Sequence, residues 1–195
     1  MLFGLCVLGG LFLVPRAINM CPSIVLRIRC KYILFFSYLG GVLWLTLGQR
    51  IGMEVSQVRL KPFYVIRQML NCGFGFKKIS VVACRSIFSN SKNIFNAAHT
   101  TPVEDLFLNI ILFIPFGFLL PYIAPKLKFK TIFLMGFACS CTIEIIQLIA
   151  KWGCCDIDDV INNTLGTCIG YLCYRLDVRL RNQKQLESFP VKIIQ

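Results

Sequence analysis

The chain has 195 residues, of which 56% are hydrophobic and 15% are charged, and its 21 Lys and Arg against 9 Asp and Glu give a formal net charge of +12. Soluble domains average about 45–50% apolar and about 25% charged residues. The composition therefore excludes a water-facing globular protein, and it excludes intrinsic disorder, which requires low hydrophobicity. The bases lie between apolar runs rather than in one stripe among aromatic residues, so nucleic acid is not an expected partner. An integral membrane protein surrounded by membrane lipids is the prediction.

The chain opens with an apolar run at residues 2–14. This run is shorter than the about 20 residues that a straight spanning helix needs, and it lacks the basic start of a signal peptide. We treat residues 1–31 as an N-terminal extension that could supply a fifth transmembrane segment. A signal peptide and a misassigned start codon are the alternatives.

Four further apolar segments predict an all-α membrane protein, a bundle of four transmembrane helices. The predicted helices are residues 32–49, 106–125, 131–150 and 160–174. The second contains Pro115 and Pro121, which a membrane helix tolerates when neighbours satisfy the freed backbone groups. The third is interrupted only by Glu144. We assign residues 32–175 to the transmembrane domain and residues 176–195 to a basic cytoplasmic tail.

The bases predict the orientation, because short positively charged loops stay in the cytoplasm. With four spans, three basic segments fall on one side: Arg27, Arg29 and Lys31; Lys126, Lys128 and Lys130; and Arg175, Arg179, Arg181 and Lys184. The connection at 151–159 carries three Asp and one Lys and is expected outside. The long connection at 50–105 carries eight bases, but long loops translocate largely regardless of charge.

The polar residues of the last two helices fall on single faces. At 100° per residue, three side chains of the third helix lie within about 60° of one another: Ser140, Glu144 and Gln147. If the last helix begins near residue 156, a second group lies within about 80°: Asp156, Asp159, Asn163, Gly166 and Gly170. Asp158 and Asn162 then point elsewhere.

The rise of a helix places these polar groups near the outer surface. Asn109, Gln147 and Asn163 come out about 4–5 Å below the outer helix ends, and Glu144 about 9 Å. We therefore predict a polar pocket that opens outward between three helices. The candidate pocket residues are Asn109, Ser140, Glu144, Gln147, Asp156, Asp159 and Asn163.

Structural roles are open for most of these residues. Asp156 and Asp159 also suit an N-cap and its first-turn partner, and the pocket amides suit interhelical hydrogen bonds. Glu144 is the strongest functional candidate, because an ionisable group within a span costs about 2.5–3.5 kcal/mol. We expect Asp158, Lys151 and the tail bases to be solvated or to face lipid headgroups.

Cysteine and histidine give no sign of a metal site. The closest pairs among the 11 cysteines lack the C-x2-C spacing and the supporting histidines of a zinc site. We expect no metal and no cofactor, and we assign no role to His99. Cys72 and Cys84 could form a disulfide, but free thiols are the preferred interpretation.

Three blocks of the sequence resemble the VanZ-like family of bacterial membrane proteins. They are NIILFIPFGFLLP from Asn109, SCTIEIIQ from Ser140, and DIDDVINNTLGTCIGY from Asp156. They are similar to the family patterns N-x3-F-x-P-[FL]-G, S-x3-E-x2-Q and D-x2-D-x3-N-T-x-G, in the same order. The stretch RLKPF is similar to the family's N-L-x-P-F, with Arg59 in place of the usual Asn. Many members also carry an Arg before the first Asp, where this chain has WGCC.

The resemblance implies a multi-pass protein of the bacterial cell membrane. It links the chain to glycopeptide tolerance of the teicoplanin type or to cell-envelope physiology, without an established reaction. Carried over by position, the family's residues are Asn109, Pro115, Gly117, Ser140, Glu144, Gln147, Asp156, Asp159, Asn163, Thr164 and Gly166. We expect four of the small or kinking residues to serve helix packing: Pro115, Gly117, Gly166 and Gly170.

The leading functional hypothesis is a non-enzymatic protein whose pocket engages a glycopeptide antibiotic, a lipid-linked cell-wall precursor or a partner protein. No nucleophile, base and orienting group stand at a recognisable spacing, so we assign no catalytic residue. Two alternatives are open. The chain could be an intramembrane hydrolase or transferase acting on a lipid-linked phosphate, with Glu144 as general acid or base and Asp156 and Asp159 on a divalent cation. It could also be a small proton-coupled transporter that uses Glu144 as a relay.

Overall fold

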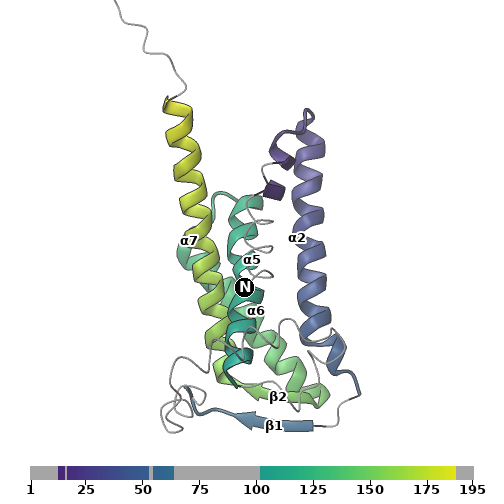
Figure 1. Ribbon diagram of the computed structural model, residues 1–195. Coiled ribbons are helices and arrows are strands. Elements are labelled where there is room, and N and C mark those ends of the chain that lie inside the picture. Colours follow the sequence, from purple (N-terminus) through teal and green to yellow (C-terminus); the bar gives the residue numbers. More distant parts are fainter. Residues whose placement is uncertain (1–12, 16, 53–54, 64–101, 188–195) are drawn as a thin grey trace, which may run out of the picture.

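The computed structural model describes residues 13–15, 17–52, 55–63 and 102–187. In this part of the chain four long helices follow one another: α2 (Ile24–Thr46), α5 (Pro102–Ile123), α6 (Phe129–Ala150) and α7 (Ile157–Glu187). A short 3-10 helix, η1 (Gly48–Arg50), follows α2, and the same part of the chain contains two strands, β1 (Val55–Arg59) and β2 (Trp152–Asp156). Successive long helices run in opposite directions, and both strands lie at one end of the bundle (Figure 1).

Three stretches of the described helices are long and apolar enough to cross a membrane: Ile24–Arg50, Leu106–Ile123 and Phe129–Ala150. Their outward surfaces carry large apolar side chains, such as Ile33, Trp44 and Ile149, that are more than half exposed. Surfaces of this kind suit a lipid environment. The prediction of a mainly helical protein with helices apolar enough to span a membrane is confirmed. The number of spans stays a prediction. The role of residues 2–14 stays one too, since residues 1–12 lie outside the described part.

Two helices are longer than the sequence predicted. Helix α2 begins at Ile24 rather than at residue 32, because Ser23 accepts a hydrogen bond from the Leu26 amide at 3.4 Å as N-cap. The bases at 27, 29 and 31 therefore belong to the helix and do not precede it. Helix α7 continues to Glu187, since neither proline nor glycine follows Gly170 within it. Residues 176–187, expected as part of a tail, are helical.

The two strands correct the expectation of an all-α chain. They form a parallel two-stranded sheet in which Val55 pairs with Trp152 and Arg59 with Asp156. Each strand has only five residues, and the pairing joins segments almost a hundred residues apart in sequence. No local periodicity marks such a pair, so the sequence predicted only a short outer connection at 151–159 and no strand.

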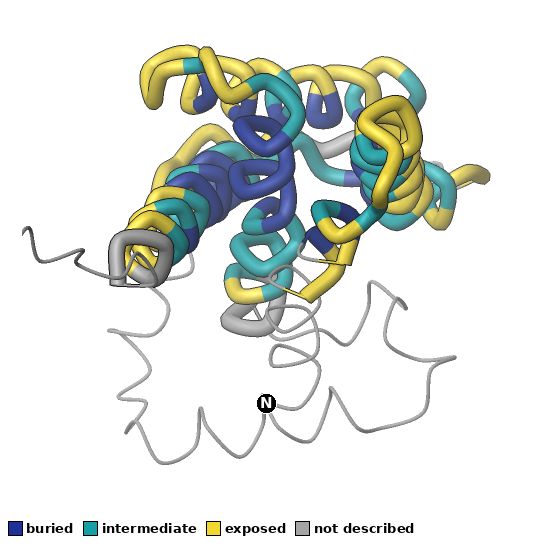
Figure 2. The backbone as a smooth tube through the Cα atoms, turned by 90° about the horizontal axis from the view of Figure 1, so that it is seen from above, coloured by how far each residue is buried: buried dark blue, intermediate teal, exposed yellow. Residues whose placement is uncertain are grey.

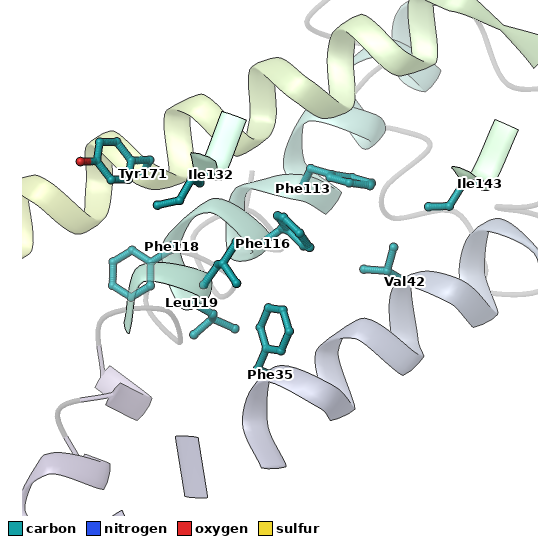
Figure 3. Close-up of a cluster of buried hydrophobic side chains, with 10 residues drawn as sticks. Phe35, Val42, Phe113, Phe116, Phe118, Leu119, Ile132, Ile143 and Tyr171 are labelled. Carbon is teal, nitrogen blue, oxygen red and sulfur yellow. The ribbon is translucent and has the colours of Figure 1, made fainter. Parts of the chain in front are cut away.

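Helix α5 lies at the centre, and the buried parts of the helices face one another (Figure 2). Phe113 and Phe118 of α5 are fully buried. In the close-up of the core, Phe35 and Val42 of α2 point toward Phe116 of α5, and the rings of Phe35 and Phe116 are 6.0 Å apart (Figure 3).

Helices α5 and α7 pack backbone to backbone. A Cβ atom added at Gly117 would lie 1.9 Å from the carbonyl oxygen of Thr167, and one at Gly170 would lie 2.0 Å from that of Ile114. Small residues permit this close approach between membrane helices. Pro115 is buried within α5, which continues past it to Ile123.

Candidate functional site

Polar side chains from six elements, η1, β1, α5, α6, β2 and α7, meet at the end of the bundle where the strands lie. We call this group the polar cluster: Arg50, Arg59, Asn109, Ser140, Glu144, Gln147, Asp156, Asp158, Asp159 and Asn163. It includes every residue that the sequence predicted for a pocket, and it adds Arg50, Arg59 and Asp158. Hydrogen bonds link the members between helices, so the geometry of the cluster depends on how the helices pack.

Glu144 lies on the buried face of α6 and is 4% exposed. Its carboxylate accepts a hydrogen bond from the backbone amide of Asp156 at 2.9 Å. The guanidinium of Arg50 lies within electrostatic range of the same carboxylate. Ser140 and Gln147 share this buried face, as the 100° spacing predicts. Glu144 therefore connects the last turns of α6 to the junction between β2 and α7.

Gln147 joins α6 to the end of α2. Its amide nitrogen donates to the carbonyl oxygen of Thr46 at 3.0 Å, and its amide oxygen accepts from Nη1 of Arg50 at 3.1 Å. Arg50 also lies against the backbone of β2, because a Cβ at Gly153 would be 2.8 Å from Nη1. Arg50 was not among the predicted pocket residues. Its position directly after the apolar run at 32–49, on the side where short loops carry few bases, was the signal that could have identified it.

Asp156 occupies the N-terminal end of α7. Its Oδ1 accepts from the amide of Asp158 at 2.9 Å, the geometry of an N-cap, and its Oδ2 lies 3.8 Å from Nη1 of Arg59. Burial raises the pKa of the Asp156 carboxyl, and the negative charge of Asp158 raises it further. The hydrogen bond from the Asp158 backbone amide and the positive charge of Arg59 act in the opposite direction and lower this pKa. The ion pair is partly solvated, with 52% of the Arg59 side chain and 15% of the Asp156 side chain exposed.

Asp159 and Asn163 connect α7 to the other helices. Asn109 of α5 donates from Nδ2 to Oδ1 of Asp159 at 2.6 Å. Deeper in the bundle, Asn163 and Ser140 of α6 are hydrogen-bonded at 2.8 Å. Ser140 lies seven residues before Gln147, about 10 Å along α6. The expectation that Asn163 lies level with Gln147 is therefore wrong, because α7 starts at residue 157 and carries Asn163 further inward.

The amide of Asn163 is only partly satisfied. Asn163 is 3% exposed, and its Oδ1 is buried without a hydrogen-bond partner. The side-chain oxygen and nitrogen of an asparagine are assigned from their hydrogen bonds. In the structure Ser140 engages Nδ2, and Oδ1 is the atom left without a partner. A buried unsatisfied polar atom costs about 1–3 kcal/mol, so this position favours a bound polar group.

Asp158 differs from its prediction. It is 7% exposed rather than solvated, and its Oδ1 accepts from the backbone amide of Phe63 at 2.6 Å. Phe63 has a φ of 60°, a left-handed conformation that is rare for a bulky residue. The segment after β1 therefore covers the start of α7, a long-range contact that the face of α7 alone does not reveal. Asn162, expected away from the pocket face, is also buried, whereas Lys151 is exposed.

The two aspartates of the cation-binding alternative are engaged by other groups, Asp156 by Arg59 and Asp159 by Asn109. In the described residues, no group of three or more His, Cys, Asp or Glu side chains could hold a metal ion. The eight cysteines among these residues are free thiols. His99, Cys72 and Cys84 lie outside the described residues.

Comparison with known proteins agrees with the three sequence blocks. Residues 30–178 match the model of the family described as VanZ/LLP1. Protein VanZ of Enterococcus faecium is 34% identical over 108 residues, which cover 55% of this chain and 67% of that protein. No solved structure matches the chain. The family match includes the whole polar cluster, all of α5 and α6, and most of α2 and α7. The chain is therefore a helical membrane protein that belongs to the VanZ/LLP1 family.

Proposed function

We propose that the chain is a multi-pass protein of the bacterial cell membrane that lowers sensitivity to glycopeptides of the teicoplanin type. In this proposal the polar cluster opens to the outer side of the membrane and binds the polar head of an amphiphilic ligand. That ligand is a lipid-tailed glycopeptide or a lipid-linked cell-wall precursor. The protein acts by binding, without a chemical step of its own.

The observation that carries the proposal is the unsatisfied Asn163 amide beneath the buried Glu144. Both side chains incur a desolvation cost that packing alone does not require. The carboxylates of the cluster already accept hydrogen bonds from Asn109 and from the amides of Phe63, Asp156 and Asp158. These contacts hold the acids in place as fixed acceptors, which supports recognition rather than proton transfer.

The distribution of bases supports an outward-facing cluster. The helix ends opposite the polar cluster carry Arg27, Arg29, Lys126, Lys128 and Arg179, at the end of the bundle away from the strands. Short basic segments favour the cytoplasmic side, so the polar cluster belongs on the outer side in this orientation. The large exposed apolar surface beside it suits a ligand with a lipid tail.

The test expresses the full chain in a glycopeptide-susceptible Gram-positive host and measures inhibitory concentrations of teicoplanin, vancomycin and a lipopeptide. The chain should raise tolerance to teicoplanin, the lipid-tailed glycopeptide, more than tolerance to vancomycin. Glu144→Gln should abolish this rise at an unchanged protein level, because it keeps the shape of the side chain and removes its charge.

Asp177→Asn is the matched control. It neutralises another buried acid, in the second half of α7 and ion-paired with Arg181, and at an equal protein level it should leave teicoplanin tolerance unchanged. A parent chain that confers no tolerance would reject the proposed role. Full tolerance in the Glu144→Gln variant would remove the polar cluster from the mechanism, and equal loss in the Asp177→Asn variant would show that the effect is not specific to the cluster.

A further inference from the structure

A second group of charged side chains lies at the other end of the bundle, around Tyr122 near the end of α5. We call it the basic cluster: Arg27 and Lys31 of α2, Tyr122 of α5, and Asp177 and Arg181 of α7. Nothing in the proposed binding of an outer ligand uses these residues. They lie among the described basic helix ends, opposite the strands.

The contacts within the basic cluster converge on the tyrosine. Nζ of Lys31 lies 4.2 Å from the centre of the Tyr122 ring. The Tyr122 hydroxyl donates to the carbonyl oxygen of Pro15 at 2.6 Å and also interacts with Arg181. Both Arg27 and Arg181 are within electrostatic range of Lys31. Three cations from two helices therefore occupy one small region.

Their charge is only partly compensated. Arg181 forms an ion pair with Asp177, whose side chain is fully buried. Arg27 donates from Nη2 to the carbonyl oxygen of Cys21 at 2.9 Å, a contact that brings no negative charge. The Nε atoms of Arg27 and Arg181 are buried without a hydrogen-bond partner. Among the described residues of this cluster, three cations thus face one carboxylate, and both guanidiniums have donor capacity left.

We propose that the basic cluster binds the phosphate of an anionic phospholipid in the cytoplasmic leaflet. A phosphate accepts paired hydrogen bonds from the planar guanidinium fork, and it supplies the negative charge that the cluster lacks. Exposed apolar side chains of the same two helices, such as Ile28 of α2 and Leu176 and Leu180 of α7, provide surface for the acyl chains. The inner leaflet is rich in anionic lipids, and the orientation proposed from the bases places the cluster there.

The experiment titrates the detergent-solubilised full chain with phosphatidylglycerol, and separately with phosphatidylcholine of the same acyl chains, and counts bound lipid by native mass spectrometry. Phosphatidylglycerol should bind more tightly. Arg27→Gln and Arg181→Gln should each weaken its binding about fivefold, the effect of one surface charge near anionic lipid. Arg29→Gln and Arg179→Gln are matched controls on the same helices, with exposed side chains, and should change binding less than twofold.

Equal weakening by the control variants would show diffuse attraction to positive charge and would overturn the site. Equal affinity for the two lipids would overturn it as well. Inorganic phosphate should fail to compete at the lipid's concentration, and full competition would assign the cluster to a free anion instead. If the Gln variants do not fold, as judged by circular dichroism, Arg27→Lys and Arg181→Lys decide the question. These variants keep the positive charge but lack the planar guanidinium. We expect them to bind phosphatidylglycerol two- to threefold more weakly, and unchanged binding would refute the proposal.

Discussion

Gly166 controls how closely α5 and α7 approach beside the polar cluster, and its replacement by alanine should separate them. The added Cβ would lie 2.2 Å from the carbonyl oxygen of Ile110, against 3.4 Å for an ordinary contact. Backbone must therefore move by about 1.2 Å. An equal movement along the Asn109–Asp159 hydrogen bond would lengthen it from 2.6 Å to about 3.8 Å, beyond hydrogen-bonding range.

Crowding of this kind typically costs about 1–3 kcal/mol. Gly41→Ala in α2 is the control, because no atom lies within 4 Å of its added Cβ. That variant should gain about 0.5–1 kcal/mol, since alanine restricts the unfolded chain and favours helix. Unfolding by SDS in mixed micelles, followed by circular dichroism, should separate the two variants by at least about 1.5 kcal/mol. Equal stability of the two variants would refute the close backbone-to-backbone packing of α5 and α7 at Gly166.

Two further predictions concern the surroundings of the polar cluster. Lys151→Gly should stabilise the fold by about 0.5–1 kcal/mol, because Lys151 ends α6 with a φ of 57°, which glycine adopts without strain. The control Lys130→Gly lies within the helix and should destabilise the fold in the same unfolding assay. A loss of stability in both variants would contradict the proposed strain at Lys151. Arg59→Gln should raise the pKa of Asp156 further, since Arg59 opposes the effect of burial. An acid whose folded pKa exceeds its unfolded value destabilises the fold above that pKa, and the penalty disappears as pH falls below the unfolded value. The variant's loss of stability should be at most about 1 kcal/mol for so exposed a pair. It should be largest at neutral pH and vanish near pH 4. For the control Lys61→Gln, the difference in stability from the parent chain should not change with pH. A pH-independent loss would contradict the assignment to Asp156.

The sequence predicted what depends on neighbours along one helix. The shared face of Ser140, Glu144 and Gln147 follows from 100° per residue and nothing else, and the structure buries all three. The contact that Glu144 makes was not predictable in the same way. Its donor is the backbone amide of Asp156, and that amide reaches it only because β2 turns the chain back over α6.

Arg50, Arg59 and Asp158 lay outside the prediction for the same reason. Their partners Gln147, Asp156 and Phe63 are 95 to 97 residues away in sequence. Such pairs form when the five-residue strands bring two distant segments together. A single sequence carries no periodic signal for pairing between two short strands. Arg50 and Arg59 therefore had no predicted partner.

The two hydrogen bonds of Gln147 have a consequence for how the polar cluster assembles. One bond reaches Thr46 at the end of α2, and the other reaches Arg50 in η1, which follows it. The buried side chains of α2 are Phe35 and Val42, and its remaining surface is exposed or partly exposed. Tyr38 adds one contact midway, through its hydroxyl to the carbonyl oxygen of Leu112. Arg50 stays bonded to Gln147 and within electrostatic range of Glu144 only while α2 stays docked on these few contacts. Assembly of the site and attachment of its least buried helix are therefore one equilibrium, and the lipids that surround α2 take part in setting it.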